Sequence, residues 1–95
     1  MANNEQIFRD AVNVFGEAAV LDKCIEEAAQ LIVALQQYKN GYQDAVTVQG
    51  DIAGVLVACG LASHLFGTDG VLSWCDKEIE RVSDAVNKAR DSAHA

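Results

Sequence analysis

The chain has 95 residues, of which 51% are apolar and 22% are charged, with no proline and a net charge of −7 at pH 7. The apolar content excludes a disordered tail, and the acidic balance disfavours binding to a nucleic-acid backbone. A chain of this length is expected to form one domain with a modest core, which oligomerisation often completes.

The first half of the chain predicts two helices. Residues 4–15 form a short amphipathic helix, which Gly16 ends. Residues 17–40 form a longer helix, and Asn40 followed by Gly41 is a typical C-terminal signal. Its apolar residues recur at spacings of three and four, at Ala18, Leu21, Cys24, Ile25, Ala28, Ile32 and Leu35.

The second half predicts two more helices. Residues 44–66 follow Asp44, a favourable N-cap, and form an apolar helix that we expect to be buried. Residues 69–90 form the last helix, with Thr68 and Asp69 as capping residues. Its apolar stripe consists of Val71, Leu72, Cys75, Ile79, Val82 and Val86. Residues 1–3 and 91–95 are expected to be frayed tails.

Four helices with short connections predict an all-α, antiparallel four-helix bundle that spans residues 1–95 as a single domain. The three cysteines, Cys24, Cys59 and Cys75, are expected to be reduced thiols in the core. No basic-then-apolar leader is visible at the N-terminus, and the apolar run at 52–62 is about half a membrane span. We therefore expect a cytoplasmic protein that binds neither membrane nor nucleic acid.

Acidic side chains stand on two of the apolar helices. Glu26, Glu27 and Gln30 share one region of the second helix, and Asp51 stands near the start of the third. If these helices pack together, Glu26, Glu27 and Asp51 converge and need a cation, for which Mg²⁺ is suited. The alternative is that these acids are solvated.

The stretches FGEAAVLDKCIEEAAQLIVALQQYKNG, DIAGVLVACGLASHLFG and WCDKEIERV resemble the MazG-like all-α NTP pyrophosphohydrolases, over roughly residues 8–86. The resemblance implies a helical bundle that forms dimers or tetramers. It also implies Mg²⁺-dependent attack of water on a nucleoside triphosphate, which releases pyrophosphate and a monophosphate. The family signatures are E-E-x-x-E on the second helix and E-x-x-D on the third.

The chain keeps this signature only in part. Glu26 and Glu27 match the first two acids, whereas Gln30 stands at the third. Asp51 replaces the glutamate of the third helix, and Gly54 replaces its aspartate. A site with so few anions binds Mg²⁺ weakly. The resemblance thus implies a weak metal site at Glu26, Glu27 and Asp51, and no confident catalytic residue.

The resemblance also implies that Lys77 and Arg81, on the last helix, hold phosphates. Gln30 and Lys23 are further candidates for contacting a phosphate. The alternatives are ion pairs of Lys77 and Arg81 with Glu80 or Asp84, and of Lys23 with Glu26 or Glu27. Tyr38, Tyr42 and Trp74 either stack on a base or pack at the bundle ends or at an interface.

Small residues recur at every fourth position of the third helix, at Gly50, Gly54, Ala58 and Ala62. This stripe either opens a pocket or permits a close helix crossing. The favoured function is binding or sequestering of an anionic nucleotide, or of a nucleotide-derived signal, by a homo-oligomer without efficient hydrolysis. A phage-encoded protein of this kind would act in the host cytosol. The alternatives are an active Mg²⁺-dependent pyrophosphohydrolase and a non-catalytic protein-interaction module.

Overall fold

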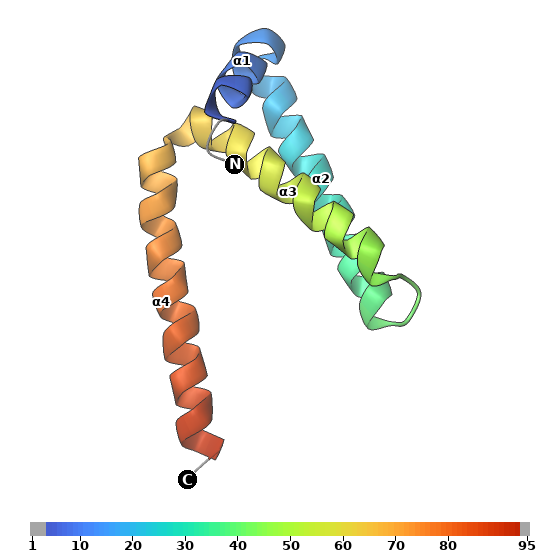
Figure 1. Ribbon diagram of the computed structural model, residues 1–95, viewed down its shortest axis with the longest axis vertical. Helices are drawn as coiled ribbons and strands as arrows, with labels where there is room; N and C mark the ends of the chain where they lie inside the picture. The colour runs from blue at the N-terminus through green and yellow to red at the C-terminus, as the bar shows by residue number, and fades with distance from the viewer. Residues whose placement is uncertain (1–3, 94–95) are drawn as a thin grey trace. The chain divides into compact units, whose positions relative to one another are not determined.

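The computed structural model describes residues 4–93, and these residues form four helices and no strand. The helices are α1 (Glu5–Phe15), α2 (Glu17–Lys39), α3 (Ala45–Phe66) and α4 (Thr68–Ala93), shown in Figure 1. The all-helical fold class predicted from the sequence is therefore confirmed. The N-terminal tail predicted at 1–3 and the last two residues of the chain lie outside the described residues.

The helix boundaries follow the local signals that the sequence provides. Gly16 and Gly41 have φ values of +87° and +82°, a left-handed conformation that ends α1 and α2 at little steric cost. Asp44 caps α3, because Thr47 donates its backbone N–H to Asp44 Oδ1 at 2.8 Å. This bond lowers the pKa of the Asp44 carboxyl below its ordinary value of 3.8.

Two boundaries of α4 differ from the prediction. Thr68 is the first residue of the helix, so Thr68 and Asp69 lie within its first turn rather than ahead of it. The helix also continues to Ala93, so residues 91–93 are helical rather than frayed. Arg90 lies in this last turn, where a cation interacts favourably with the helix dipole.

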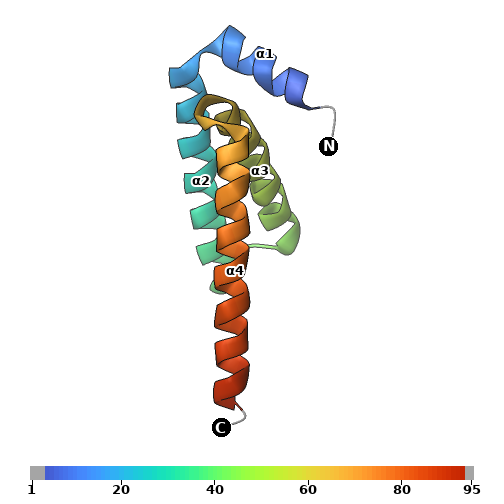
Figure 2. The same ribbon diagram turned by 90° about the vertical axis from the view of Figure 1, so that its left-hand side faces the viewer.

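The chain divides into two compact units, one up to Leu65 and one from Phe66 onward. In the first unit, α2 and α3 run side by side in opposite directions, and α1 crosses the end of this hairpin (Figures 1 and 2). Phe8 of α1 lies against Gly60, where a Cβ atom would come within 2.6 Å of the ring. The same ring meets partly buried His64 edge-on, with centroids 6.1 Å apart.

The buried core is smaller than the sequence predicts. Among the described residues only Val20, Ala34 and Ala58 are buried, so Ala58 is the single buried residue of α3. Cys24 is partly buried, but Cys59 and Cys75 are exposed, which corrects their expected place in the core. Several large apolar side chains that follow the helical period are exposed as well, among them Ile25 and Ile32 of α2.

By length and composition α3 could also cross a membrane. The core helix of a soluble protein meets the same criterion, so the expectation of a protein without a membrane contact stays a prediction.

Candidate functional site

Glu27 of α2 lies against Gly54 of α3. A Cβ atom at Gly54 would overlap Glu27 Oε2 and would lie 3.0 Å from Glu27 Cδ. The Glu27 side chain is only 13% exposed. The missing side chain at Gly54 therefore provides the space that the Glu27 carboxylate occupies.

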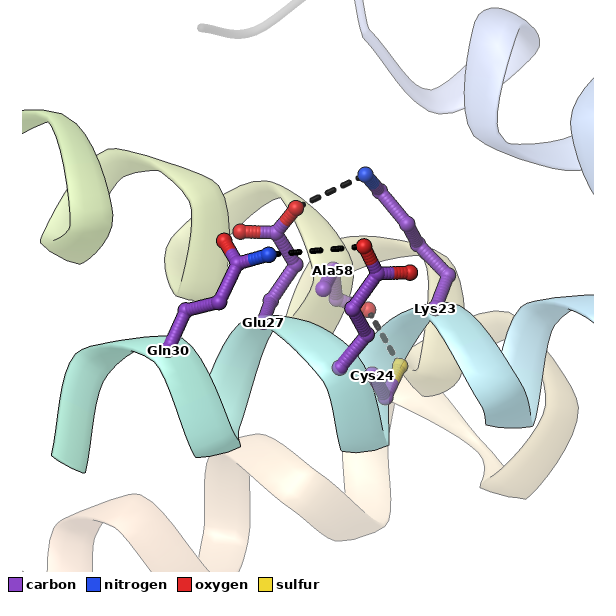
Figure 3. Close-up of polar contacts among 6 residues, drawn as sticks. Lys23, Cys24, Glu27, Gln30 and Ala58 are labelled. Atoms are coloured by element: carbon purple, nitrogen blue, oxygen red, sulfur yellow. Dashed lines mark hydrogen bonds and ion pairs between the residues drawn. The ribbon is translucent and has the colours of Figure 1, made fainter. Parts of the chain in front are cut away.

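Lys23 neutralises this carboxylate from within α2. Its Nζ lies 2.7 Å from Glu27 Oε1, one helical turn away (Figure 3). The hydrogen bond and the charge of Glu27 raise the pKa of Lys23 above its ordinary value. The ion pair considered for Lys23 in the sequence is thus present, and its partner is Glu27.

Glu26 and Gln30 form a second, separate pair on the exposed side of α2. Gln30 donates its Nε2–H to Glu26 Oε1 at 3.4 Å (Figure 3). This weak contact is made to a neighbour on the same helix, and both side chains are exposed. The two adjacent glutamates therefore have different partners.

Asp51 lies in an open groove of about 390 Å³ between α2 and α3. Gln30 also lines this groove, as do Gln37 and Gln43, whose amides interact at 3.4 Å. The remaining lining residues are Ala29, Val33 and Ala34. The groove thus presents three carboxamides and one carboxylate, a set that can accept and donate hydrogen bonds but carries no cation.

The sequence analysis missed Gln37 and Gln43. Gln37 follows Gln30 by seven residues and Val33 by four, so helical periodicity alone places all three on one face of α2. Gln43 lies in the loop after α2, where periodicity gives no information.

No three or more His, Cys, Asp or Glu side chains gather into a group able to hold a metal within residues 4–93. Of the three acids proposed as ligands, Glu27 is paired with Lys23, Glu26 is paired with Gln30, and Asp51 faces the groove. A Mg²⁺ site built from them stays a prediction, and it requires these side chains to change partners.

Lys77 and Arg81 lie on α4, in the second unit, and both have local partners. Lys77 Nζ lies 4.4 Å from the centroid of the Trp74 ring, a cation–π contact. Arg81 Nη1 lies 2.9 Å from Glu78 Oε1, so its acidic neighbour is Glu78 rather than Glu80 or Asp84. Both members of that pair are exposed, and such pairs exchange partners at little cost.

The small-residue stripe of α3 is used at a helix crossing. Ala58 is 2% exposed, and its carbonyl oxygen accepts a hydrogen bond from Cys24 Sγ at 3.1 Å. Burial raises the pKa of this thiol. Gly54 and Ala58 therefore lie against α2, whereas a Cβ atom at Gly50 would meet no atom within 4 Å.

No protein-family model, curated protein or solved structure matches this chain. The resemblance to the MazG-like family therefore stays a prediction, based on the three sequence stretches between about residues 8 and 86.

Proposed function

We propose that this chain is a MazG-like nucleotide-binding protein with an eroded Mg²⁺ site, which binds or sequesters a nucleotide or a nucleotide-derived signal without efficient hydrolysis. The observation that carries the proposal is the Lys23–Glu27–Gly54 arrangement. Glu27 occupies the space left by the missing acid at Gly54, and the ammonium of Lys23 balances its charge. The carboxylate thus has a cationic partner within the chain.

The groove supports the binding part of the proposal. Its carboxamides and the Asp51 carboxylate suit the hydrogen-bonding edge of a base, and its lining residues include no cation that would hold a phosphate. The family resemblance separately assigns phosphate contacts to Lys77 and Arg81 of α4, which are exposed and whose local contacts are exchangeable. We propose that the protein acts in the cytosol. If the protein is encoded by a phage, this is the cytosol of the host cell.

Calorimetry with a panel of nucleoside mono-, di- and triphosphates and cyclic nucleotides, with and without Mg²⁺, tests this function. We expect binding that does not need Mg²⁺ and produces no pyrophosphate. The double variant Lys77→Ala/Arg81→Ala should weaken binding by at least ~10-fold, the effect of losing charge-assisted contacts. Glu27→Ala should weaken it much less. Lys88→Ala, which removes another lysine of α4, is the matched control.

Two other outcomes would replace the proposal. Mg²⁺-dependent release of pyrophosphate at several per second, abolished by Glu27→Ala, would identify an active pyrophosphohydrolase. That alternative is favoured by the presence of Asp51 and Gln30 in one groove. A chain that binds none of the nucleotides would be a protein-interaction module, a function favoured by its many exposed apolar side chains.

Restoring the two missing acids tests the erosion of the metal site directly. Gln30→Glu with Gly54→Asp should strengthen Mg²⁺ binding, because each carboxylate adds a hard oxygen ligand and a charge. Without Mg²⁺ the same variant should be less stable, since the aspartate introduced on α3 would displace Glu27 and repel it. Gln37→Glu adds one acid to the groove away from Gly54 and serves as the control. Unchanged Mg²⁺ affinity in the double variant would show that these two positions do not face a common metal site.

A further inference from the structure

The groove between α2 and α3 offers acceptors and donors in unequal number. All of its lining residues belong to the first unit. Asp51 is partly buried there and makes no hydrogen bond or ion pair with residues 4–65. Both oxygens of its carboxylate are therefore open acceptors that face the groove.

A short series of hydrogen bonds orients the amide of Gln37. The backbone N–H of Asp44 donates to Gln43 Oε1 at 3.1 Å, and Gln43 Nε2 donates to Gln37 Oε1 at 3.4 Å. Because the oxygen of Gln37 is engaged, its Nε2 is left to donate to a ligand. Gln30 has the opposite arrangement, since its Nε2 is directed to Glu26 and its oxygen remains an acceptor (Figure 3).

Aliphatic side chains line the groove between these two amides. Val33 and Ala34 lie between Gln30 and Gln37, which are seven residues and about 10.5 Å apart along α2. The volume of about 390 Å³ is within the usual range of small-ligand sites. A flat ring can thus lie on this apolar wall with its polar edge toward Asp51 and Gln37.

We propose that the groove selects guanine, an inference that rests on the proposed nucleotide-binding function. The base-pairing edge of guanine carries an acceptor, O6, followed by two donors, N1–H and the exocyclic amino group. The complement is one donor followed by two acceptors, which Gln37 Nε2 and the two Asp51 oxygens supply. Adenine and cytosine place a ring-nitrogen acceptor beside their amino group, and a carboxylate repels it. Uracil has a single N–H between two carbonyl oxygens.

A bidentate contact of this kind discriminates between bases by roughly 5- to 150-fold. The groove is open to water, which competes for the same hydrogen bonds. We therefore expect the lower part of this range, about 5- to 20-fold in favour of guanine.

Titration of the isotope-labelled full chain, followed by amide NMR signals in buffer without Mg²⁺, tests the inference. The probes are the nucleoside monophosphates of guanine, adenine, cytosine and uracil, which share the phosphate. Guanosine monophosphate should bind at least ~5-fold more tightly than the others and should shift the signals of Gln37 and Asp51. Inosine monophosphate keeps N1–H but lacks the amino group, so its affinity should lie between those of the guanine and adenine nucleotides.

Asp51→Asn should switch the specificity, which a merely structural role of Asp51 would not do. The carboxamide replaces one acceptor by a donor and so matches the edge of xanthine, which has a carbonyl in place of the amino group of guanine. Guanosine monophosphate should bind at least ~5-fold more weakly than to the wild type, and xanthosine monophosphate at least ~5-fold more tightly. Cytidine monophosphate controls for the lost charge, because its edge does not match the variant. Asp22→Asn removes the same charge from an exposed position of α2 outside the groove and should change none of these affinities.

The outcomes separate this inference from the function on which it rests. Equal affinity for the four bases, or a guanine preference that survives Asp51→Asn, would overturn the inference and leave nucleotide binding in place. Signals that shift only on α4 would overturn it as well, because the base would then lie outside the groove. If no member of the wider calorimetric panel binds, the proposed function itself is wrong. The base panel on the unaltered chain decides the question even if Asp51→Asn loses helical circular dichroism.

Discussion

The contact between Gly54 and Glu27 gives a quantitative prediction for Gly54→Ala. An alanine in a helix interior is favoured over glycine by ~0.5–1 kcal/mol. At Gly54 the new Cβ atom would overlap Glu27 Oε2, so the carboxylate must move and loosen its pair with Lys23. Forcing a side chain off its rotamer costs ~0.5–1.5 kcal/mol. The two terms oppose each other, so the net effect of Gly54→Ala on the wild type should lie between a stabilisation of ~0.5 kcal/mol and a destabilisation of ~1 kcal/mol.

A double-mutant cycle isolates this contact. With Glu27→Ala the overlapping atoms are gone, so the added Gly54→Ala should stabilise the chain by ~0.5–1 kcal/mol. The helix-propensity gain cancels between the two backgrounds, so the expected coupling equals the cost of displacing Glu27, ~0.5–1.5 kcal/mol, within the range for residues in contact. Gly50→Ala is the control, because its Cβ atom would meet no neighbour within 4 Å. It should stabilise both backgrounds equally.

Urea denaturation followed by far-ultraviolet circular dichroism measures all six proteins, at one fixed protein concentration so that association contributes equally. For a domain of this size ~1 kcal/mol corresponds to a shift of ~4–8 °C in Tm, which makes thermal melts an independent check. If Gly54→Ala stabilises the wild type and the Glu27→Ala background by the same amount, the Glu27 carboxylate does not occupy the space at Gly54 and the reasoning is refuted.

Three further predictions follow from local contacts. The cap bond lowers the pKa of Asp44, so the stabilisation by the ionised Asp44 carboxylate should be present above pH 3.8 and lost as the pH falls below that value. Asp44→Asn keeps an N-cap acceptor and should remove this pH dependence in thermal melts from pH 6 to pH 2. Gly60→Ala should push Phe8 aside and speed amide exchange in α1 more than in α2, whereas equal effects would contradict the Phe8 contact. The Cys24 thiol, whose pKa is raised by burial, should be alkylated more slowly at pH 8 than exposed Cys59, as peptide mass spectrometry would measure.

The sequence was sufficient to predict the helices because their signals are local. Glycines at 16 and 41 needed a left-handed conformation, Asp44 offered a capping oxygen, and apolar residues recurred with the helical period. These features act within one turn and do not depend on what the helix packs against. The end of α4 was placed too early because its last residues carry no terminating signal such as Gly or Pro before Ala93.

The core could not be predicted in the same way. Periodicity identifies an apolar face but does not say which molecule covers it, so residues such as Ile32 and Cys59 were expected inside a core yet are exposed. A chain whose faces are completed by a second copy has the same pattern as one that completes its own core. The two cases differ in their tertiary and quaternary contacts, and the spacing of residues within one helix carries no information about those contacts.

The pairing of charges in the site was also beyond the sequence. The spacing of three and four residues places Lys23 within reach of both Glu26 and Glu27. Lys23 pairs with Glu27, the glutamate that lies against α3. Glu27 points toward the small surface at Gly54, where burial strengthens an ion pair, while Glu26 stays in water and holds only Gln30. Two adjacent residues of the same type thus have different environments because they lie about 100° apart around α2.

Under the proposed function, the loss of the acid at Gly54 and the retention of Glu27 are one physical change. The resemblance implies that an aspartate at this position would face Glu27 across the helix crossing, and two facing carboxylates need a cation between them. With glycine there, the space is free, Glu27 fills it, and Lys23 supplies the positive charge that a metal would otherwise bring. A lysine ammonium cannot activate a water molecule as Mg²⁺ does, since it offers no open coordination position. The arrangement therefore favours a structural role for Glu27 over a catalytic one. It explains why an acid can be kept in a site that has lost the partners needed for hydrolysis.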